Sequence, residues 1–290
     1  MTRRVFAILT LAALFVPSAL RADQSHIKDV VYQHKLGVAL TMDVFKPEKP
    51  NGIGILWMVS GGWVSDHKNI APDLARPFTD RGMTVFHVVH GTQPRFTLPE
   101  IVEDIHRAVR FVRTNAASWG VNPDKLGISG GSAGGHLSLM MGAYGAPGDP
   151  NAKDPVDRAS SRVQAIACLF PPTDFLNYGQ EGQAAMKVPM LRVFWPAFGI
   201  TDKTSEEELE KLGRSLSPIY GDLKNMPPTL IVHGDADLLV PTQQSRRLIA
   251  KLEEARIKCK LEVRPGKAHG WPGIEQEATT LADWFEQHLK

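Results

Sequence analysis

Short apolar runs alternate with amphipathic stretches along most of this chain. Residues 53–59 form a continuous apolar run, which is typical of a strand buried on both faces of a sheet. The segment Thr97-Leu98-Pro99-Glu100 has the residues of a capping box with proline in the first turn, and it predicts a long helix that ends near Gly120. That helix would bury an apolar stripe of Ile101, Ile105, Ala108 and Val112.

The same patterns predict the other elements. Residues 30–32 and 40–45 predict an antiparallel hairpin that turns around Gly37. Further strands are predicted at 53–59, 83–89, 125–129, 163–170, 229–233 and 259–264, and helices at 70–81, from 97, from 133, at 241–255 and at 275–289. Repeated β-α-β units with short connections imply an α/β fold, with a mostly parallel sheet flanked by helices.

Residues 175–226 interrupt this alternation. They contain several aromatic residues and an acidic helical stretch at 205–212, and they predict no strand. An insertion of about 50 residues above the strand ends would form a lid over a site. We therefore expect one domain, residues 23–290, with a lid insertion after the sixth strand.

The first 22 residues have the three parts of a secretory signal peptide. Arg3 and Arg4 precede an apolar run at 5–16, and Ala22 offers a small residue for cleavage. The run is shorter than the roughly 20 residues that a membrane-spanning helix needs. We expect export to the periplasm or the medium, without stable membrane insertion.

Composition and charge exclude several classes of protein. The chain is 43% hydrophobic and 22% charged, as in ordinary globular proteins. Without the three arginines of the signal segment, 30 basic residues face 31 acidic ones, which argues against nucleic-acid binding.

Cys168 and Cys259 fall in predicted strands. With one strand between them they would be too far apart for a disulfide, and neither has metal-ligand spacing, so we expect two free thiols and no zinc site.

The strongest chemical motif is Gly130-Gly131-Ser132-Ala133-Gly134, between a predicted strand and a predicted helix. G-x-S-x-G at such a junction indicates a nucleophile elbow, in which a strained serine raises its hydroxyl above the sheet. A simple glycine-rich turn and a phosphate-binding loop are the alternatives. The dinucleotide fingerprint fails because Ser132 takes the place of its middle glycine, and the P-loop fails because no Gly-Lys-Ser/Thr follows.

A serine nucleophile needs a base and an acid that orients the base. In the order Ser, acid, His, the candidates are Asp237 and His269, each of which follows a predicted strand. Parallel strands gather their ligand sites at their carboxyl ends. Asp235 is the competing acid, although its place close to the strand end favours a role in ordering the turn.

The other histidines have simpler interpretations. His106 lies among charged residues on a predicted helix, which indicates a surface position. His87 and His233 fall within strands, where core histidines with hydrogen-bond partners are expected. His136 is one helical turn beyond Ser132, so it would line the site without acting as the base.

Ser60-Gly61-Gly62-Trp63 follows the buried strand at 53–59. Alone it predicts a tight turn. Beside an elbow it predicts an oxyanion hole, in which the N–H groups of Gly61, Gly62 and Ala133 bind the developing negative charge.

Taken together, these motifs resemble the α/β-hydrolase superfamily over roughly residues 28–290. The most similar branch is that of exported esterases related to feruloyl-esterase and hormone-sensitive-lipase-like enzymes. The resemblance is densest in DIHRAVRFVRTNAASWGVNPDKLGISGGSAGGH, residues 104–136. It implies an eight-stranded core sheet, an acyl-enzyme mechanism without a cofactor, and the roles of Ser132, Asp237 and His269 as nucleophile, acid and base. One departure is that the family usually has His-Gly-Gly-Gly where this chain has Val59-Ser60-Gly61-Gly62.

We therefore expect a serine esterase that cleaves short-chain acyl, aryl or carbohydrate-linked esters. Trp63, Trp195 and Trp271 are the candidate substrate-binding residues, together with Phe194 and Phe198, although each could simply be part of the core. Two alternatives stay open: a prolyl-oligopeptidase-like serine peptidase and a non-catalytic binding protein with a hydrolase fold. The peptidase class usually carries a large additional N-terminal domain, and non-catalytic relatives commonly lose a member of the triad.

Overall fold

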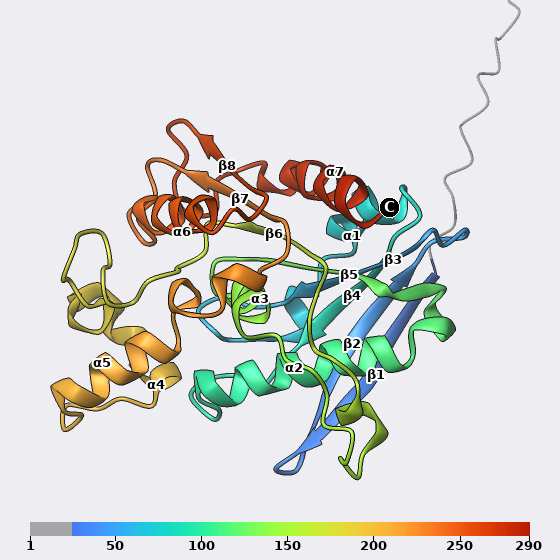
Figure 1. Ribbon diagram of the computed structural model, residues 1–290, viewed down its shortest axis with the longest axis horizontal. Helices are drawn as coiled ribbons and strands as arrows, with labels where there is room; N and C mark the ends of the chain where they lie inside the picture. Colours follow the sequence, from blue (N-terminus) through green and yellow to red (C-terminus); the bar gives the residue numbers. More distant parts are fainter. Residues whose placement is uncertain (1–24) are drawn as a thin grey trace, which may run out of the picture.

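The computed structural model describes residues 25–290, and an eight-stranded sheet runs through its centre (Figure 1). The strands lie in the order β1-β2-β4-β3-β5-β6-β7-β8. β2 pairs antiparallel with β1 and with β4, and every other neighbouring pair is parallel. The strands are β1 (Ser25–Lys35), β2 (Val38–Lys46), β3 (Gly52–Met58), β4 (Thr84–Val89), β5 (Val121–Gly131), β6 (Ala165–Leu169), β7 (Thr229–Gly234) and β8 (Cys259–Arg264). The predicted mostly parallel eight-stranded sheet is confirmed.

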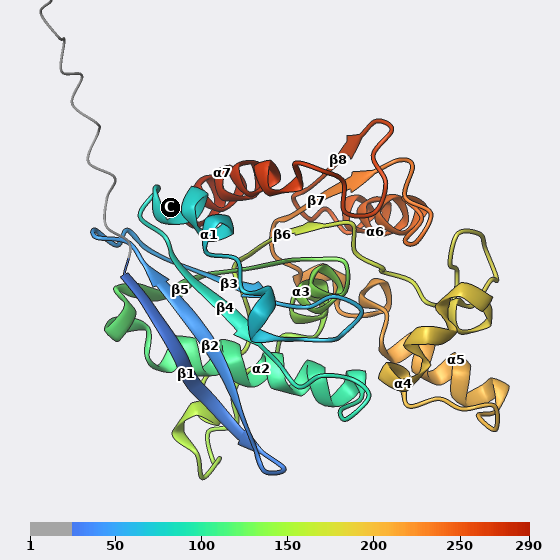
Figure 2. The same ribbon diagram turned by 180° about the vertical axis from the view of Figure 1, so that it is seen from behind.

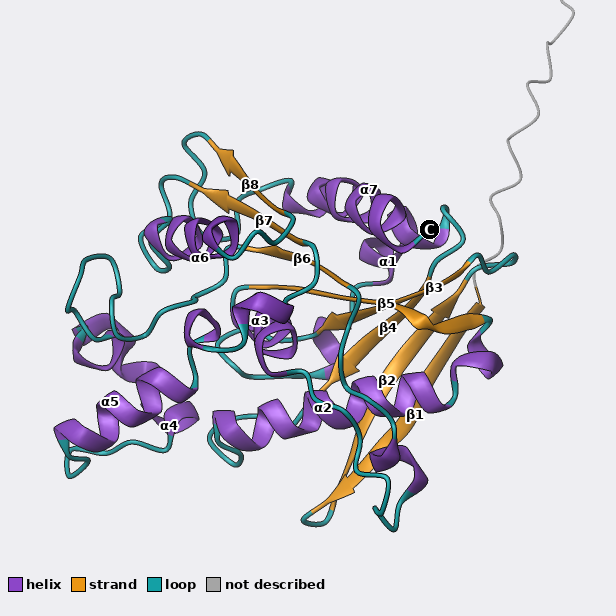
Figure 3. Ribbon diagram, in the orientation of Figure 1, coloured by secondary structure: helices purple, strands orange, loops and turns teal. Residues whose placement is uncertain are grey.

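Helices cover both faces of the sheet (Figure 3). α1 and α7 bury apolar residues in one core cluster, and α2, α3 and α6 bury theirs in the other. The α-helices are α1 (Pro72–Thr79), α2 (Leu98–Thr114), α3 (Ala133–Tyr144), α4 (Trp195–Phe198), α5 (Glu206–Ser215), α6 (Gln243–Glu254) and α7 (Glu277–Leu289). The 3-10 helices are η1 (His67–Asn69), η2 (Ala116–Trp119), η3 (Pro155–Arg158), η4 (Ala185–Lys187), η5 (Pro189–Phe194), η6 (Pro218–Tyr220), η7 (Leu223–Asn225) and η8 (Ile274–Gln276).

The helix α2 forms as its residues predict. The backbone N–H and the hydroxyl of Thr97 both donate to the Glu100 carboxylate at 2.8 Å, which caps the first turn. The predicted stripe of Ile101, Ile105, Ala108 and Val112 is fully buried. The helix ends at Thr114, and η2 continues to Gly120, whose left-handed backbone at φ 68° ends the segment.

The predicted surface position of His106 is wrong. The connection from α3 to β6 folds across the outer side of α2, and Nδ1 of His106 lies 2.8 Å from the hydroxyl of Ser161 in that connection. Arg107 fastens the same connection through ion pairs with Asp154 and Asp157. Charged neighbours on a helix therefore did not mark a solvent-exposed face here.

The insertion after the sixth strand joins β6 to β7 and contains α4, α5 and the 3-10 helices η4 to η7. No strand interrupts it among its described residues. Its acidic helix α5 begins with a capping box between Ser205 and Glu208, near the predicted start. In Figure 2 the segment with α4 and α5 lies to one side of the sheet. That this insertion acts as a lid stays a prediction.

The predicted signal peptide, residues 1–22, lies outside the described residues. Between residues 25 and 290, no helix has the length and apolar character needed to cross a bilayer. Cys168 in β6 and Cys259 in β8 are free thiols, and β7 lies between the two strands.

Candidate active site

Ser132 occupies a sharp turn between β5 and α3. Its backbone has φ 53° and ψ −118°, a strained conformation for a residue with a side chain. The strand and the helix approach so closely that a Cβ on Gly130 would lie 2.6 Å from the backbone of Gly134. A Cβ on Gly134 would lie 2.8 Å from the carbonyl oxygen of Met58. The geometry is that of the predicted nucleophile elbow.

The structure brings Ser132, His269 and Asp237 together in one hydrogen-bonded row. Nε2 of His269 lies 2.9 Å from the Ser132 hydroxyl, and Nδ1 lies 2.7 Å from Oδ2 of Asp237. The three residues follow β5, β8 and β7, whose parallel carboxyl ends share one edge of the sheet. The distances suit transfer of a proton from the serine to the imidazole.

Asp237 is held as a carboxylate by donors on both of its oxygens. Oδ1 accepts the backbone N–H groups of Leu239 and Val240 at 3.0 and 2.8 Å. Oδ2 faces His269 and, at 3.2 Å, Nε2 of His233. Burial raises the pKa of Asp237, but the hydrogen bonds from His233, His269 and Val240 outweigh it and hold that pKa well below its usual range.

Asp235, the competing acid, orders the turn instead. Its Oδ1 accepts the N–H of Gly266 at 2.6 Å, which ties the loop after β7 to the loop after β8. Those two loops carry Asp237 and His269. The structure therefore places Asp237, and not Asp235, against the imidazole of His269.

The turn after β3 differs from the predicted oxyanion hole at one residue. The Gly61 N–H donates to the Val64 carbonyl at 3.0 Å, and the Val64 N–H donates back to Gly61, so these residues flank a two-residue turn. The central residues, Gly62 and Trp63, both have positive φ, 56° and 59°. The prediction of Gly61 as a donor is wrong because this turn consumes its N–H.

Three residues that line a cavity together with Ser132 have backbone N–H groups without a protein acceptor among the described residues. Within residues 25–290, the N–H groups of Gly62, Trp63 and Ala133 donate to no other protein group. All three residues and Ser132 line the same cavity. Ala133 begins α3, so its N–H also lies at the positive end of the helix. The backbone N–H of Trp63, a residue predicted only to bind substrate, is thus unpaired in the described part of the chain, whereas that of Gly61 is paired.

A hydrogen bond joins the side chain of His136 to this turn. His136 is fully buried, its Nε2 lies 2.7 Å from the Leu216 carbonyl, and its Nδ1 accepts the indole N–H of Trp63 at 3.3 Å. Because a carbonyl only accepts and an indole only donates, the proton must reside on Nε2. Burial lowers the pKa of His136 to about 4, so the ring is neutral at neutral pH. It does not contact the Ser132 hydroxyl as a base would.

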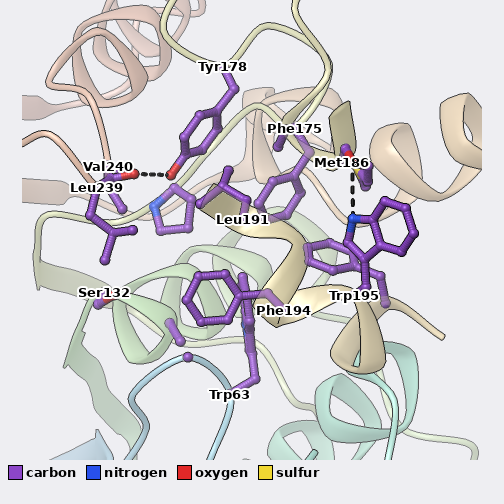
Figure 4. A pocket seen from close by; sticks show the side chains of 15 residues that line it. Trp63, Ser132, Phe175, Tyr178, Met186, Leu191, Phe194, Trp195, Leu239 and Val240 are labelled. Carbon is purple, nitrogen blue, oxygen red and sulfur yellow. Dashed lines mark hydrogen bonds between the residues drawn. The ribbon is translucent and has the colours of Figure 1, made fainter. Parts of the chain in front are cut away.

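The cavity beside Ser132 is small, ≈ 40 Å³, and almost entirely apolar (Figure 4). The turn after β3 and the insertion together form most of its wall. Its labelled lining side chains are Trp63, Ser132, Phe175, Tyr178, Met186, Leu191, Phe194, Trp195, Leu239 and Val240. Phe198 lines it too.

Of the three predicted substrate-binding tryptophans, the structure brings two to this cavity. Trp63 and Trp195 line it, and the indole N–H of Trp195 donates to the Met186 carbonyl at 3.1 Å. Trp271 does not line it, contrary to expectation. Trp271 is buried in the core cluster of α1 and α7, with its ring 5.9 Å from that of Phe170.

Comparison with known proteins places the chain in a family. The model of the BD-FAE family matches residues 42–252, a span that includes Ser132 and Asp237. The chain belongs to the BD-FAE family. The predicted resemblance to the esterase branch of the α/β hydrolases is thereby confirmed.

Similar proteins include several esterases. A probable carboxylic ester hydrolase, LipM of Mycobacterium tuberculosis, is 27% identical over 80% of this chain and 53% of its own length. A truncated carbohydrate esterase from gut microbiota is 26% identical with a TM-score of 0.77, covering 93% of this chain and 98% of its own. The butyrate-bound esterase Est2 of Thermogutta terrifontis is 27% identical with a TM-score of 0.68, covering 91% and 92%. The chain spans about half the length of the curated relatives it matches.

Proposed function

We propose that the protein is a serine esterase that hydrolyses carboxylic esters of short-chain acids through an acyl-enzyme on Ser132. One observation carries this proposal: the hydrogen-bonded row from Ser132 through His269 to Asp237, built on a strained elbow. Membership of the BD-FAE family and the esterase names of similar proteins support the same chemistry.

In the first half of the reaction, the Ser132 oxygen attacks the ester carbon while Nε2 of His269 takes the hydroxyl proton. The imidazolium that results is stabilised by the Asp237 carboxylate, 2.7 Å from Nδ1. When the bond from the carbon to the alcohol oxygen breaks, His269 gives the proton to the departing alcohol. The acyl group then remains on Ser132.

The negative charge on the carbonyl oxygen is the costliest feature of the transition state. Gly62, Trp63 and Ala133 line the cavity next to Ser132, and their backbone N–H groups lack protein acceptors among residues 25–290. We assign them to the oxyanion. One donor of this kind contributes roughly 3–4 kcal/mol of transition-state stabilisation.

In the second half, water replaces the alcohol. His269 takes a proton from the water molecule while the water oxygen attacks the acyl carbon. The tetrahedral adduct then collapses, which releases the acid and frees the Ser132 oxygen. The proton returns from His269 to the serine oxygen, so the enzyme is restored and one ester yields one acid and one alcohol.

The size of the cavity favours short acyl groups. Since one water needs about 10–15 Å³ of such space, ≈ 40 Å³ holds roughly three groups of that size. An acetyl to butyryl chain fits this estimate, and the butyrate bound to the similar Est2 supports it. We propose an alcohol side of aryl or carbohydrate type, which the carbohydrate esterase relative supports.

The test is turnover of p-nitrophenyl acetate by the purified protein and by Ser132→Ala. We expect steady hydrolysis by the wild type and a loss of at least ~10³-fold in kcat for the variant. Ser129→Ala is a matched control, because Ser129 is buried on β5 and donates to the Ala167 carbonyl away from the row. Retention of most turnover by Ser132→Ala would overturn the proposal. Cleavage of an aminoacyl-proline anilide without ester turnover would favour the peptidase instead.

A further inference from the structure

A second histidine contacts the same carboxylate oxygen of Asp237 as His269 does. Nε2 of His233, at the end of β7, lies 3.2 Å from Oδ2 of Asp237 and 2.9 Å from the Val240 carbonyl. Nδ1 of the same ring lies 2.6 Å from the hydroxyl of Ser245 on α6. The side chains of His233 and Asp237 are both 0% exposed, so water does not compete for these contacts.

The partners of the ring determine where its proton lies. A carboxylate and a backbone carbonyl only accept hydrogen bonds, so Nε2 must carry the hydrogen that it shares between Asp237 and Val240. Nδ1 then has a lone pair, and it accepts the hydroxyl of Ser245. The Ser245 hydroxyl, which can donate or accept, is compatible with the tautomer that donates toward Asp237.

We propose that His233 is a positioning residue that holds Asp237, and the turn that carries it, in the orientation His269 requires. The proposal rests on the proposed function of the row. His233 acts at two points of one turn: it donates to the Asp237 carboxylate and to the carbonyl of Val240, three residues later. The turn closes on itself because the Val240 N–H donates to Oδ1 of Asp237 at 2.8 Å. Without the imidazole, the buried carboxylate would lose a donor and the turn would lose its anchor to β7.

The charge on the carboxylate links this contact to the pH dependence of the reaction. Three titratable groups face Asp237: His233 from β7, His269 from the loop after β8, and Tyr178 from the insertion. The Tyr178 hydroxyl donates to the Leu239 carbonyl at 2.8 Å. A donor to Oδ2 withdraws negative charge from the oxygen that also faces His269. Loss of that donor would make the protonated form of His269 more stable, so a higher pH would be needed to generate the base.

Two amide variants separate the two ends of the ring. In His233→Gln the amide nitrogen can reach the position of Nε2 and still donate to Asp237, whereas in His233→Asn it reaches only the position of Nδ1, next to Ser245. We expect His233→Gln to stay within about threefold of the wild-type kcat for p-nitrophenyl acetate. We expect His233→Asn to lose about 10- to 100-fold in kcat, less than the roughly 10⁴-fold loss known for replacing a triad acid. In His233→Asn the acid limb of the kcat/KM profile should move to higher pH by about half a unit or more.

His87→Leu is the matched control, since His87 is another buried strand histidine and lies outside the site. It should leave both kcat and the acid limb in place. Histidine 15N spectra of the wild-type protein provide a test that requires no variant to fold, because His233 should appear as the Nε2–H tautomer. An Nδ1–H tautomer of His233 would overturn the proposal. Equal losses of kcat in His233→Gln and His233→Asn would also overturn it, as would an acid limb of the kcat/KM profile that does not move in His233→Asn. If the wild type itself fails to turn over esters, the proposed function fails instead.

Discussion

The indole N–H of Trp63 donates to Nδ1 of His136 at 3.3 Å, and this contact joins the turn after β3 to the helix that follows Ser132. Nε2 of His136 continues the connection to the Leu216 carbonyl in the insertion. The rings of Phe194 and Phe198, also in the insertion, pack edge-on against Trp63. The turn proposed to bind the oxyanion is therefore held in position partly by contacts with residues of the insertion.

Replacing Trp63 by Phe removes the indole donor and leaves the buried Nδ1 of His136 without a partner. We expect kcat to fall about tenfold with little change in KM, because the backbone N–H groups of the turn act mainly in the transition state. Steady-state kinetics on p-nitrophenyl acetate measure this. Trp119→Phe is the control, since the Trp119 indole N–H is buried without a partner among the described residues. A Trp63→Phe variant with wild-type kcat would contradict this role of the indole.

Adding a methyl group to the turn should have opposite consequences at its two glycines. A Cβ at Gly62 would lie 2.7 Å from the Phe194 ring, at a φ of 56° that disfavours side chains, whereas a Cβ at Gly61 meets nothing within 4 Å. We expect Gly62→Ala to lower the free energy of unfolding by about 1–2 kcal/mol and to reduce kcat, and Gly61→Ala to do neither. Chemical denaturation of the two variants measures the free energy of unfolding, and steady-state kinetics measure kcat. Equal behaviour of the two variants would count against this geometry.

The acyl preference should follow the volume of the cavity. Leu191 lines it, so Leu191→Ala opens space for about two more carbons of the acyl chain. At roughly 0.8 kcal/mol per buried methylene, kcat/KM for a hexanoyl ester relative to an acetyl ester should rise about tenfold. Leu209→Ala, on α5 and outside this cavity, should leave the ratio unchanged. A ratio unaffected by Leu191→Ala would place the acyl group elsewhere.

Buried neutral histidines should make the fold sensitive to acid. Burial lowers the pKa of His87 to about 3 and that of His90 to about 4, as it does for His136. Because these values lie below the unfolded value of about 6.5, the unfolded chain binds more protons as the pH falls. The stability contributed by each ring is complete above pH ~6.5 and is lost progressively as the pH falls toward the folded value.

The variant His87→Leu isolates one of these rings. His87 was expected to have hydrogen-bond partners, but its two nitrogens are buried without partners among residues 25–290. It should flatten the dependence of the free energy of unfolding on pH by about 1.4 kcal/mol per pH unit between roughly pH 6 and pH 4. Urea unfolding at several pH values measures the slope. A slope equal to that of the wild type would mean that His87 is protonated in the folded protein.

Much of the fold and the central row of the site were predictable, because both depend on local pattern and chain order. The apolar runs predict the strands, and Ser132, Asp237 and His269 each follow a strand of a parallel sheet, whose ends must meet. The elbow was also recognisable because only glycine tolerates the contact between positions 130 and 134.

The errors concern groups whose hydrogen-bond partners the pattern of apolar and polar residues does not specify. His106 is covered by the connection that carries Ser161, 55 residues later, and no local pattern indicates this. The Gly61 N–H is consumed by pairing with Val64, which depends on the exact hydrogen-bond register of a two-residue turn. His233 was expected only to be a core histidine, as its burial confirms, but its spacing of four residues before Asp237 was the available signal for the second role.

Labelling with a fluorophosphonate probe, followed by mass spectrometry of the modified peptide, tests the central claim most directly. We predict one phosphonyl group per protein, on Ser132, with ester turnover lost in proportion to labelling and no reaction in Ser132→Ala. Full ester turnover in a protein that the probe does not label, or labelling at a different residue, would contradict the account.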